Sequence, residues 1–334
     1  MNNEATPIYI LSGFLGSGKT TLLTRLITFW KQEGLKPAIV MNEIGEVNID
    51  GMIAGTDVPA AEMLGGCICC SIRADLASGL ARLIKNEKPD VIVIEATGAA
   101  NPMEILDAAA EAALYLQIQV KHLITVVDTA HLLHLHREQK GKSYRLMQEQ
   151  IRCASVLILN KVDRLSSEAL QEAKDIVTKW NGFAPKLPAV RCEVDLGRFL
   201  HEDHEYNGLA HADLGNSDHR HDLHAHDRGS HASHGHVMSY THYLKAPLDS
   251  REFEAFVAEL PREVYRAKGI LTFSDTASRF LFQYAFREAD FTKVNVQESL
   301  EDVIVFIGEH FSRSELQDKL AWLEGAPDRQ RGRV

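Results

Sequence analysis

Residues 13–20 form the stretch with the clearest chemical meaning, and their sequence is GFLGSGKT. It fits the pattern G-x-x-x-x-G-K-[ST], in which glycines let successive backbone N–H groups turn toward a polyphosphate. Lys19 would reach the outer phosphates, and the Thr20 hydroxyl would ligate Mg²⁺. An apolar run before the stretch and a helical pattern after it favour a nucleotide site over a plain glycine-rich turn. The predicted phosphate-binding residues are Gly13, Gly16, Ser17, Gly18, Lys19, Thr20 and Thr21.

A second motif, Asn160-Lys161-Val162-Asp163, follows an apolar run downstream of the phosphate loop. The Asp163 carboxylate would accept two parallel N–H bonds from guanine, whereas adenine offers no such donor pair on that edge. Asn160 would bridge the base and the phosphate loop, and the Lys161 stem would lie against the ring. We therefore predict that the nucleotide is GTP rather than ATP.

Glu95 comes directly after the apolar run Val91–Ile94 and opens the segment Glu95-Ala96-Thr97-Gly98. A carboxylate in this position can hold Mg²⁺, directly or through a water molecule. The alternative is an acid that caps a helix or lies on the surface. With the phosphate loop upstream we predict the metal role, so that Lys19, Thr20 and Glu95 form the catalytic group of a hydrolase.

Three cysteines, Cys67, Cys69 and Cys70, are crowded behind a pair of glycines. Such a soft ligand cluster suits Zn²⁺ or Cu(I) and also accepts Ni²⁺ or Co²⁺. Three thiolates leave one tetrahedral position for an exchangeable ligand, and Glu43 or Glu46 could add an oxygen. The alternatives are small buried side chains or a redox pair. The two other cysteines, at positions 153 and 192, are expected to be core or loop residues.

Residues 201–242 contain 11 of the 16 histidines, interleaved with Asp, Gly, Ser and Asn. So polar a tract cannot bury a core, which indicates a flexible segment. A simple polar linker is one interpretation. Imidazoles two and three residues apart also bind Zn²⁺, Ni²⁺ or Co²⁺, so we predict a metal-collecting tether without assigning single ligands.

The composition limits the kinds of partner. A formal net charge of −10 argues against nucleic acid, because there is no basic excess to neutralise phosphates. Neither a signal peptide nor a membrane-spanning run is expected. The odd number of cysteines, five, does not suggest a disulfide framework, and reduced thiols fit a cytoplasmic protein.

Short apolar runs must position these residues, and each ends on a polar residue. The runs are Ile8–Leu11, Ala38–Met41, Val91–Ile94, Leu123–Val127 and Val156–Leu159. Helical patterns lie between several of them, at Asp75–Lys85, Pro102–Leu116 and Tyr144–Ala154. Continuous apolar strands that alternate with helices indicate a parallel sheet covered on both faces, with ligands at the carboxyl ends of the strands. We predict an α/β P-loop NTPase fold with a mostly parallel sheet.

The chain after the histidine tract predicts a small α+β domain. Strands are expected at Thr241–Leu244 and Val303–Ile307, a hairpin at Val264–Phe273 and Arg279–Phe286, and helices at Ser250–Leu260 and Ser312–Leu323. The alternative is that these elements extend the first sheet. The predicted division is a GTPase domain with the cysteine motif at 1–200, a histidine-rich linker at 201–239, a C-terminal domain at 240–326 and a frayed tail at 327–334.

These motifs resemble those of the CobW-type metallochaperone GTPases, a family allied to the nickel-insertion GTPases of hydrogenase and urease maturation. The matching stretches are residues 12–21, 42–50, the cysteine cluster, 95–98 and 160–163. Ile44 and Ala96 depart from the family's usual residues. The resemblance implies a GTPase that binds zinc or a related ion at the cysteines and delivers it to a client metalloprotein. It also equates the last part of the chain with the family's C-terminal domain.

The predicted function is therefore a GTP-hydrolysing zinc metallochaperone, in which segments 42–50 and 65–70 act as nucleotide-dependent switches. One alternative keeps the GTPase and makes the ion cobalt or nickel, for the assembly of a cofactor or metalloenzyme. Another is passive storage of zinc or nickel by the histidine tract. The client is not identified by the sequence, and both a monomer and a homodimer stay open.

Overall fold

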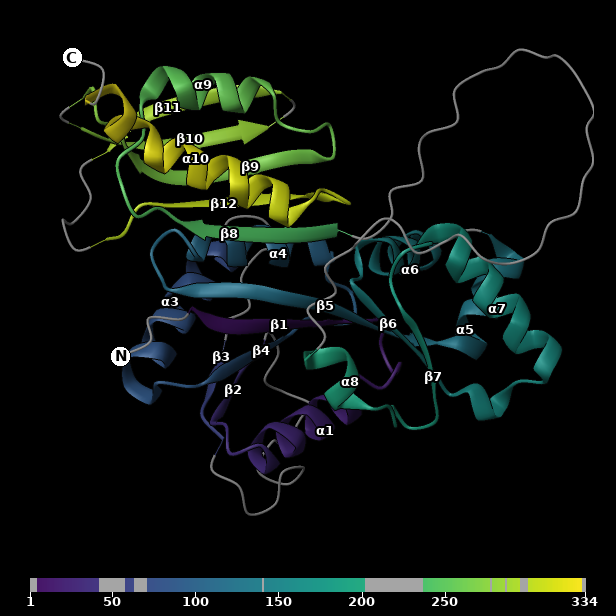
Figure 1. Cartoon of the computed structure of the whole chain (residues 1–334). Helices are drawn as coiled ribbons and strands as arrows, with labels where there is room; N and C mark the ends of the chain where they lie inside the picture. The colour runs from purple at the N-terminus through teal and green to yellow at the C-terminus, as the bar shows by residue number, and fades with distance from the viewer. Residues whose placement is uncertain are drawn as a thin grey trace, which may run out of the picture.

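Two β-sheets make up the architecture of the computed structural model, which describes residues 5–41, 58–62, 71–139, 141–201, 237–276, 278–285, 287–294 and 300–331. The first sheet is formed from residues 6–189 and the second from residues 237–309 (Figure 1). The two sheets are separate, so the C-terminal elements do not extend the first sheet.

The first sheet is parallel, with the strand order β3-β2-β4-β1-β5-β6-β7. Its strands are β1 (Thr6–Ser12), β2 (Pro37–Met41), β3 (Ala60–Glu62), β4 (Val91–Glu95), β5 (Ile118–Asp128), β6 (Val156–Asn160) and β7 (Lys186–Ala189). Strands β2, β4 and β6 are buried throughout because helices cover both faces, which explains their unbroken apolar sequences. Ser12, Glu95 and Asn160 therefore end three strands at the same edge of the sheet.

Helices cover the two faces unequally. One face carries α1 (Lys19–Gln32) and the short α8 (Leu196–His201). The other carries α3 (Ser71–Glu87), α4 (Pro102–Ala112), α5 (Thr129–Glu138), α6 (Lys142–Cys153) and α7 (Ser167–Trp180). A single 3₁₀ turn, η1 (Val162–Arg164), follows β6. Figure 1 shows α1 and α8 below the sheet and α4 above it.

The second sheet is antiparallel, with the strand order β11-β10-β9-β12-β8. Its strands are β8 (Val237–Tyr243), β9 (Val264–Thr272), β10 (Arg279–Ala285), β11 (Glu288–Val294) and β12 (Val303–Glu309). Helices α9 (Ser250–Ala258) and α10 (Arg313–Arg331) cover one face, where Phe253, Phe282 and Phe306 are fully buried. Asp249 caps α9, and the Ser312 hydroxyl accepts a hydrogen bond from the Glu315 amide at the start of α10.

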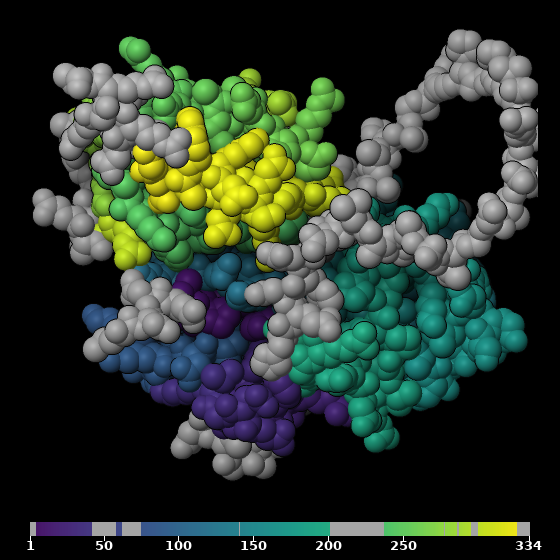
Figure 2. All heavy atoms as spheres, viewed as in Figure 1, coloured from purple at the N-terminus to yellow at the C-terminus, as the bar shows by residue number. Residues whose placement is uncertain are grey.

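The uncovered face of the second sheet packs on the first part of the chain. Val303, Val305 and Ile307 of β12 belong to the same buried cluster as α4 and β5. Two ion pairs join α4 to β9, Asp107–Arg266 and Glu111–Lys268, the latter with a separation of 2.8 Å. Figure 2 shows the C-terminal part, in green and yellow, resting on the blue part of the first. The second sheet therefore packs both on α4 and on β5, whose Ile118 amide donates to the Tyr243 hydroxyl of β8 at 3.1 Å.

The predicted fold class is confirmed, and the differences are local. Helix α4 ends at Ala112 rather than at Leu116, because the amides of Leu114 and Leu116 close a tight turn before β5. Strand β8 starts at Val237, so residues 237–239 of the predicted linker belong to the second sheet. Helix α10 runs past Gly325 to Arg331, where the sequence suggested a frayed tail. A glycine costs a helix about 1 kcal/mol and need not end it.

Candidate functional site

The phosphate loop connects β1 to α1, and its conformation requires glycine. The backbone φ angles of Gly13, Gly16 and Gly18 are 138°, 73° and 117°. A Cβ atom on Gly13 would lie 2.3 Å from the carbonyl oxygen of Val126, and one on Gly18 would lie 2.5 Å from Nδ2 of Asn160. The loop is therefore held closely between the ends of β5 and β6, and larger residues would push it out of place.

Lys19 begins α1 and is almost fully buried, with 8% of its surface exposed. Its Nζ donates hydrogen bonds to the carbonyl oxygens of Gly13 at 2.9 Å and Phe14 at 3.4 Å, which curls the loop around the ammonium group. The first turn of α1 carries no acidic residue, so its backbone amides and the lysine together make the site at the start of this helix positive. Such a site suits a polyphosphate.

Glu95 and Thr20 meet beside this loop. The Thr20 hydroxyl donates to Oε1 of Glu95 at 3.4 Å, and burial raises the pKa of Glu95 although Lys19 and Thr20 oppose that rise. Three buried oxygens, Glu95 Oε2, Ser12 Oγ and Ser17 Oγ, have no hydrogen-bond partner among the described residues. Buried oxygens of this kind call for a ligand, and a hard cation with phosphates supplies one. The residues present therefore fit Mg²⁺ with a nucleotide.

The predicted base motif lies against the same loop. Asn160 Nδ2 donates to the Ser17 carbonyl at 2.8 Å, and Lys161 Nζ donates to the Gly16 carbonyl at 2.7 Å. Both side chains thus tie the end of β6 to the phosphate loop. Asp163, in the turn η1, is exposed and so open to a ligand.

Two further residues complete the arrangement and were not predicted from the sequence. Asp128 ends β5 and accepts a hydrogen bond from Lys161 Nζ at 2.6 Å. Burial opposes ionisation of Asp128, but the hydrogen bonds from Lys161 and from the His131 amide lower its pKa. The backbone N–H of Cys192 donates to Oδ1 of Asn160 at 2.9 Å. Cys192 lies in a segment with positive φ angles, which no sequence pattern predicted. Asp128 was open to prediction, since it ends a strand as Glu95 does.

The predicted metal site lies outside the described residues. This holds for Glu43, Glu46, Cys67, Cys69 and Cys70, for the predicted switch segments, and for residues 202–236 of the histidine tract. Among the side chains that the structure does describe, no group of three or more His, Cys, Asp or Glu residues is placed to hold a metal ion. His242, which we counted with the tract, lies in β8 and hydrogen-bonds Tyr240 at 2.9 Å.

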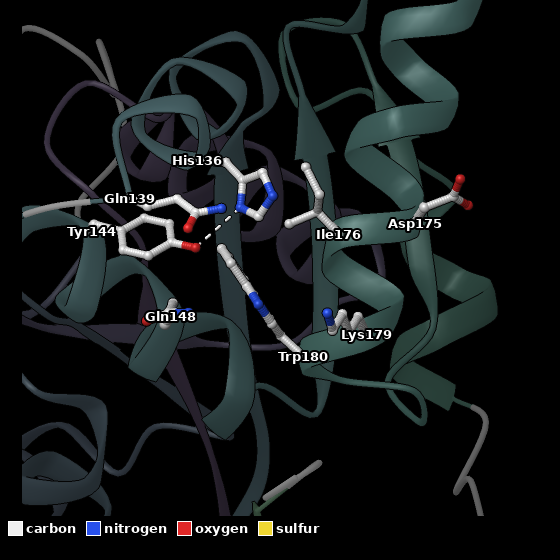
Figure 3. A pocket seen from close by; sticks show the side chains of 8 residues that line it. All are labelled: His136, Gln139, Tyr144, Gln148, Asp175, Ile176, Lys179 and Trp180. Carbon is white, nitrogen blue, oxygen red and sulfur yellow. Dashed lines mark hydrogen bonds between the residues drawn. The ribbon is translucent and has the colours of Figure 1, made fainter.

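A surface pocket of about 430 Å³ lies between α5, α6 and α7, away from the phosphate loop (Figure 3). Its inner wall is a cluster of three rings, in which His136 Nδ1 lies 3.0 Å from the Tyr144 hydroxyl and both rings contact Trp180. In Figure 3 the Asp175 carboxylate points away from the rings. The cluster joins the three helices, and the mixed charges around it, Asp175 and Lys179, select no class of ligand.

Comparison with known families decides where the chain belongs. Residues 7–188 match the family described as CobW/HypB/UreG, nucleotide-binding domain, and residues 237–323 match the cobalamin synthesis protein cobW C-terminal domain. The chain belongs to the CobW/HypB/UreG family. The predicted resemblance is confirmed, and the matched residues 7–188 run from β1 into β7 and include helices α1 to α7.

Relatives within the CobW/HypB/UreG family carry informative names. The chain is 28% identical to the zinc chaperone YjiA of Escherichia coli over 330 residues, which cover 95% of this chain and 98% of YjiA. It is 34% identical to the E. coli zinc chaperone YeiR over 163 residues, so the match spans about half (48%) of YeiR's length and of this chain's. A crystal structure of Zn(II)-bound YjiA GTPase from E. coli is 24% identical in sequence, its match covers 97% of this chain and 99% of that one, and the TM-score is 0.46.

None of the described helices is long and apolar enough to cross a membrane.

Proposed function

We propose that this protein hydrolyses GTP and uses the nucleotide to control the transfer of zinc to a client protein. The observation that supports GTP hydrolysis is that the ends of β4 and β6 both reach the phosphate loop and the start of α1. Glu95 accepts from Thr20, Asn160 donates to the Ser17 carbonyl, and Lys19 at the start of α1 donates to the Gly13 carbonyl. This is the arrangement that places a triphosphate, its metal ion and its base along one edge of a parallel sheet.

Each residue has a separate task in this proposal. The amides of the phosphate loop and Lys19 bind the outer phosphates, and the Asp163 carboxylate selects guanine by accepting hydrogen bonds from two N–H groups of the base. Thr20 and Glu95 would hold Mg²⁺, which would supply positive charge next to the phosphoryl group that is transferred. Asp128 fixes the Lys161 ammonium at 2.6 Å, so that the lysine stem stays in line with the base.

The zinc half of the proposal rests on the cysteine cluster and on the named relatives. Cys67, Cys69 and Cys70, with Glu43 as a further ligand, would hold Zn²⁺ as cargo. Segments 42–50 and 65–70 would change the affinity for zinc when GTP is hydrolysed. A hundredfold change requires only about 2.7 kcal/mol of difference between the two nucleotide states. Cobalt or nickel would fit the same ligands, and the zinc chaperones among the relatives favour zinc.

We further propose the predicted division into domains, with the second domain beginning at residue 237 instead of 240. Residues 1–200 would carry GTP hydrolysis and the cysteine site, and the histidine-rich stretch would link them to the C-terminal sheet. The cytoplasm would be the working compartment, because reduced thiols are needed for an exchangeable metal site.

Two variants test the nucleotide assignment. Lys19→Ala should abolish GTP hydrolysis, because the outer phosphates lose their cation. Asp163→Asn should weaken GTP and strengthen xanthosine triphosphate, since the new amide can donate to the oxygen that replaces the guanine amino group. Hydrolysis of both nucleotides by wild type and variants is the measurement. Normal GTP hydrolysis by Lys19→Ala would defeat the assignment of the phosphate loop.

A further inference from the structure

Gln150 is a buried polar residue whose place in the fold has no purely apolar explanation. It lies on α6 among Met147, Ile151 and Cys153, and only 1% of its surface is exposed. A leucine or methionine would fill this position without bringing an amide out of water. A buried amide is stable only when its hydrogen bonds are made, so its partners indicate what it does.

Those partners are two backbone carbonyls of the segment between β4 and α4. Gln150 Nε2 lies 3.2 Å from the Gly98 oxygen and 3.4 Å from the Ala100 oxygen. The backbone carbonyl oxygen of Gln150, within α6, accepts a hydrogen bond from the Thr125 hydroxyl of β5 at 2.8 Å. Gln150 therefore ties residues 98–100 to a point that is itself fixed to the sheet.

The segment that Gln150 holds touches the phosphate loop. The Ala96 amide donates to the Leu11 carbonyl at 2.9 Å, directly before the loop. A Cβ atom on Gly98 would lie 2.7 Å from the backbone nitrogen of Leu15, within the loop, so only glycine allows this approach. Any change in the position of residues 98–100 is thus a change in what faces the loop.

The peptide geometry makes the tie directional. In a trans peptide the C=O and the following N–H point in opposite directions. With the Gly98 carbonyl turned toward Gln150, the Ala99 N–H points away from α6. Beyond residue 100, Asn101 caps α4 by accepting from the Met103 amide at 3.0 Å, so the same tie also fixes where that helix begins.

We propose that Gln150 is a positioning residue for the reaction: it holds residues 98–100 against the phosphate loop, and their position there sets the response of the site to the terminal phosphate of GTP. This inference rests on the proposed function, because it needs a triphosphate in the loop. A residue with a purely structural role would affect only the stability of the fold. A positioning residue also affects how the site responds to the terminal phosphate.

Gln150→Met tests the proposal, because methionine has a similar length and no donor. The matched control is Gln148→Met on the same helix, since Gln148 lines the surface pocket instead of the buried face (Figure 3). Gln150→Met should lower kcat about tenfold, with kcat calculated per site that binds nucleotide. It should also reduce the preference for a non-hydrolysable GTP analogue over GDP about tenfold. GDP affinity should stay within about twofold of wild type, and Gln148→Met should match wild type in all three.

A Gln150→Met protein that is less stable but keeps the wild-type kcat and nucleotide preference would overturn the proposal. Hydrogen exchange of wild type gives a second test if the variant does not fold. Peptides that cover residues 96–101 and 143–153 should both exchange more slowly with the GTP analogue than with GDP, and equal exchange in the two states also overturns the proposal. Wild type that neither binds nor hydrolyses GTP would instead refute the proposed function.

Discussion

Cys153 and Cys192 are the two cysteines that the structure describes, and both are buried. Burial raises the pKa of the Cys153 thiol to about 12 and that of Cys192 to about 11. Both thiols are therefore protonated at neutral pH, and the two residues are at most 3% exposed. Protonated, buried thiols are poor nucleophiles and poor metal ligands.

Iodoacetamide at pH 7.5 should accordingly leave Cys153 and Cys192 unmodified in the folded protein and modify them only after unfolding. Mass spectrometry of tryptic peptides makes the measurement. The urea-unfolded protein is the control for reagent and detection. Rapid modification of Cys192 in the folded protein would show that its thiol is not buried against the Gly18 carbonyl, to which it donates at 3.4 Å.

His242 gives the second domain a pH dependence. Burial lowers the pKa of His242 below its ordinary 6.5, with Lys245 acting in the same direction and Glu324 against it. Below pH 6.5 the His242 imidazole binds a proton more readily in the unfolded chain than in the folded chain. The free energy of unfolding therefore falls as the pH falls.

Wild type should therefore lose more stability between pH 7.5 and pH 5.5 than His242→Gln does, by up to about 1.4 kcal/mol per pH unit for one proton. Urea denaturation at both pH values measures this. An equal slope in wild type and His242→Gln would contradict the expectation.

The elements around the nucleotide site were predictable because their sequences answer to local rules. Strand β1, the loop and α1 each carry their own pattern, and Glu95 and Asn160 end strands that are apolar throughout. Strand β3 and the β7–Cys192 segment were missed, because three or four residues at a sheet edge show no periodicity. Gln150 was missed because nothing local distinguishes a buried glutamine from an exposed one on a helix.

Gly98, in the segment after β4, lies close to the phosphate loop. Gly98→Ala should weaken GTP and GDP binding, since its Cβ would press on the Leu15 backbone, with the nearest atom 2.7 Å away. We expect a loss of about tenfold or more, measured with fluorescent nucleotides. Gly79→Ala in α3 is the control, because its Cβ would meet only the Ala61 side chain at 3.9 Å, an ordinary contact. Unchanged affinity of Gly98→Ala for GTP and GDP would show that the phosphate loop can move away from the new Cβ atom without weakening nucleotide binding.

The two sheets should unfold together, because residues of β12 share a buried cluster with the first part of the chain. Val305→Ala should lower the free energy of unfolding by about 2 kcal/mol, since Val305 is 1% exposed in that cluster. Val294→Ala, on the outer strand β11, is the control and should cost much less. Circular dichroism and release of bound GDP should report coincident transitions in both proteins. Separate transitions would show that the sheets are independent.

How the sheets meet was beyond sequence reasoning. The pairs Asp107–Arg266 and Glu111–Lys268 join residues more than 150 positions apart, and each residue by itself looks like an ordinary charge on a surface. The apolar positions of β12 indicated a buried strand but not that α4 would cover one of its faces. Both facts depend on tertiary packing, which local patterns do not encode.

The central claim is that the nucleotide controls the affinity for zinc. Its most direct test is the zinc dissociation constant of the whole protein, measured by competition with a chromophoric chelator in the GDP-bound state and with a non-hydrolysable GTP analogue. The account predicts constants that differ by about a hundredfold, and loss of that site when Cys67, Cys69 and Cys70 are replaced by serine. The same zinc affinity in every nucleotide state would contradict it and would favour passive storage.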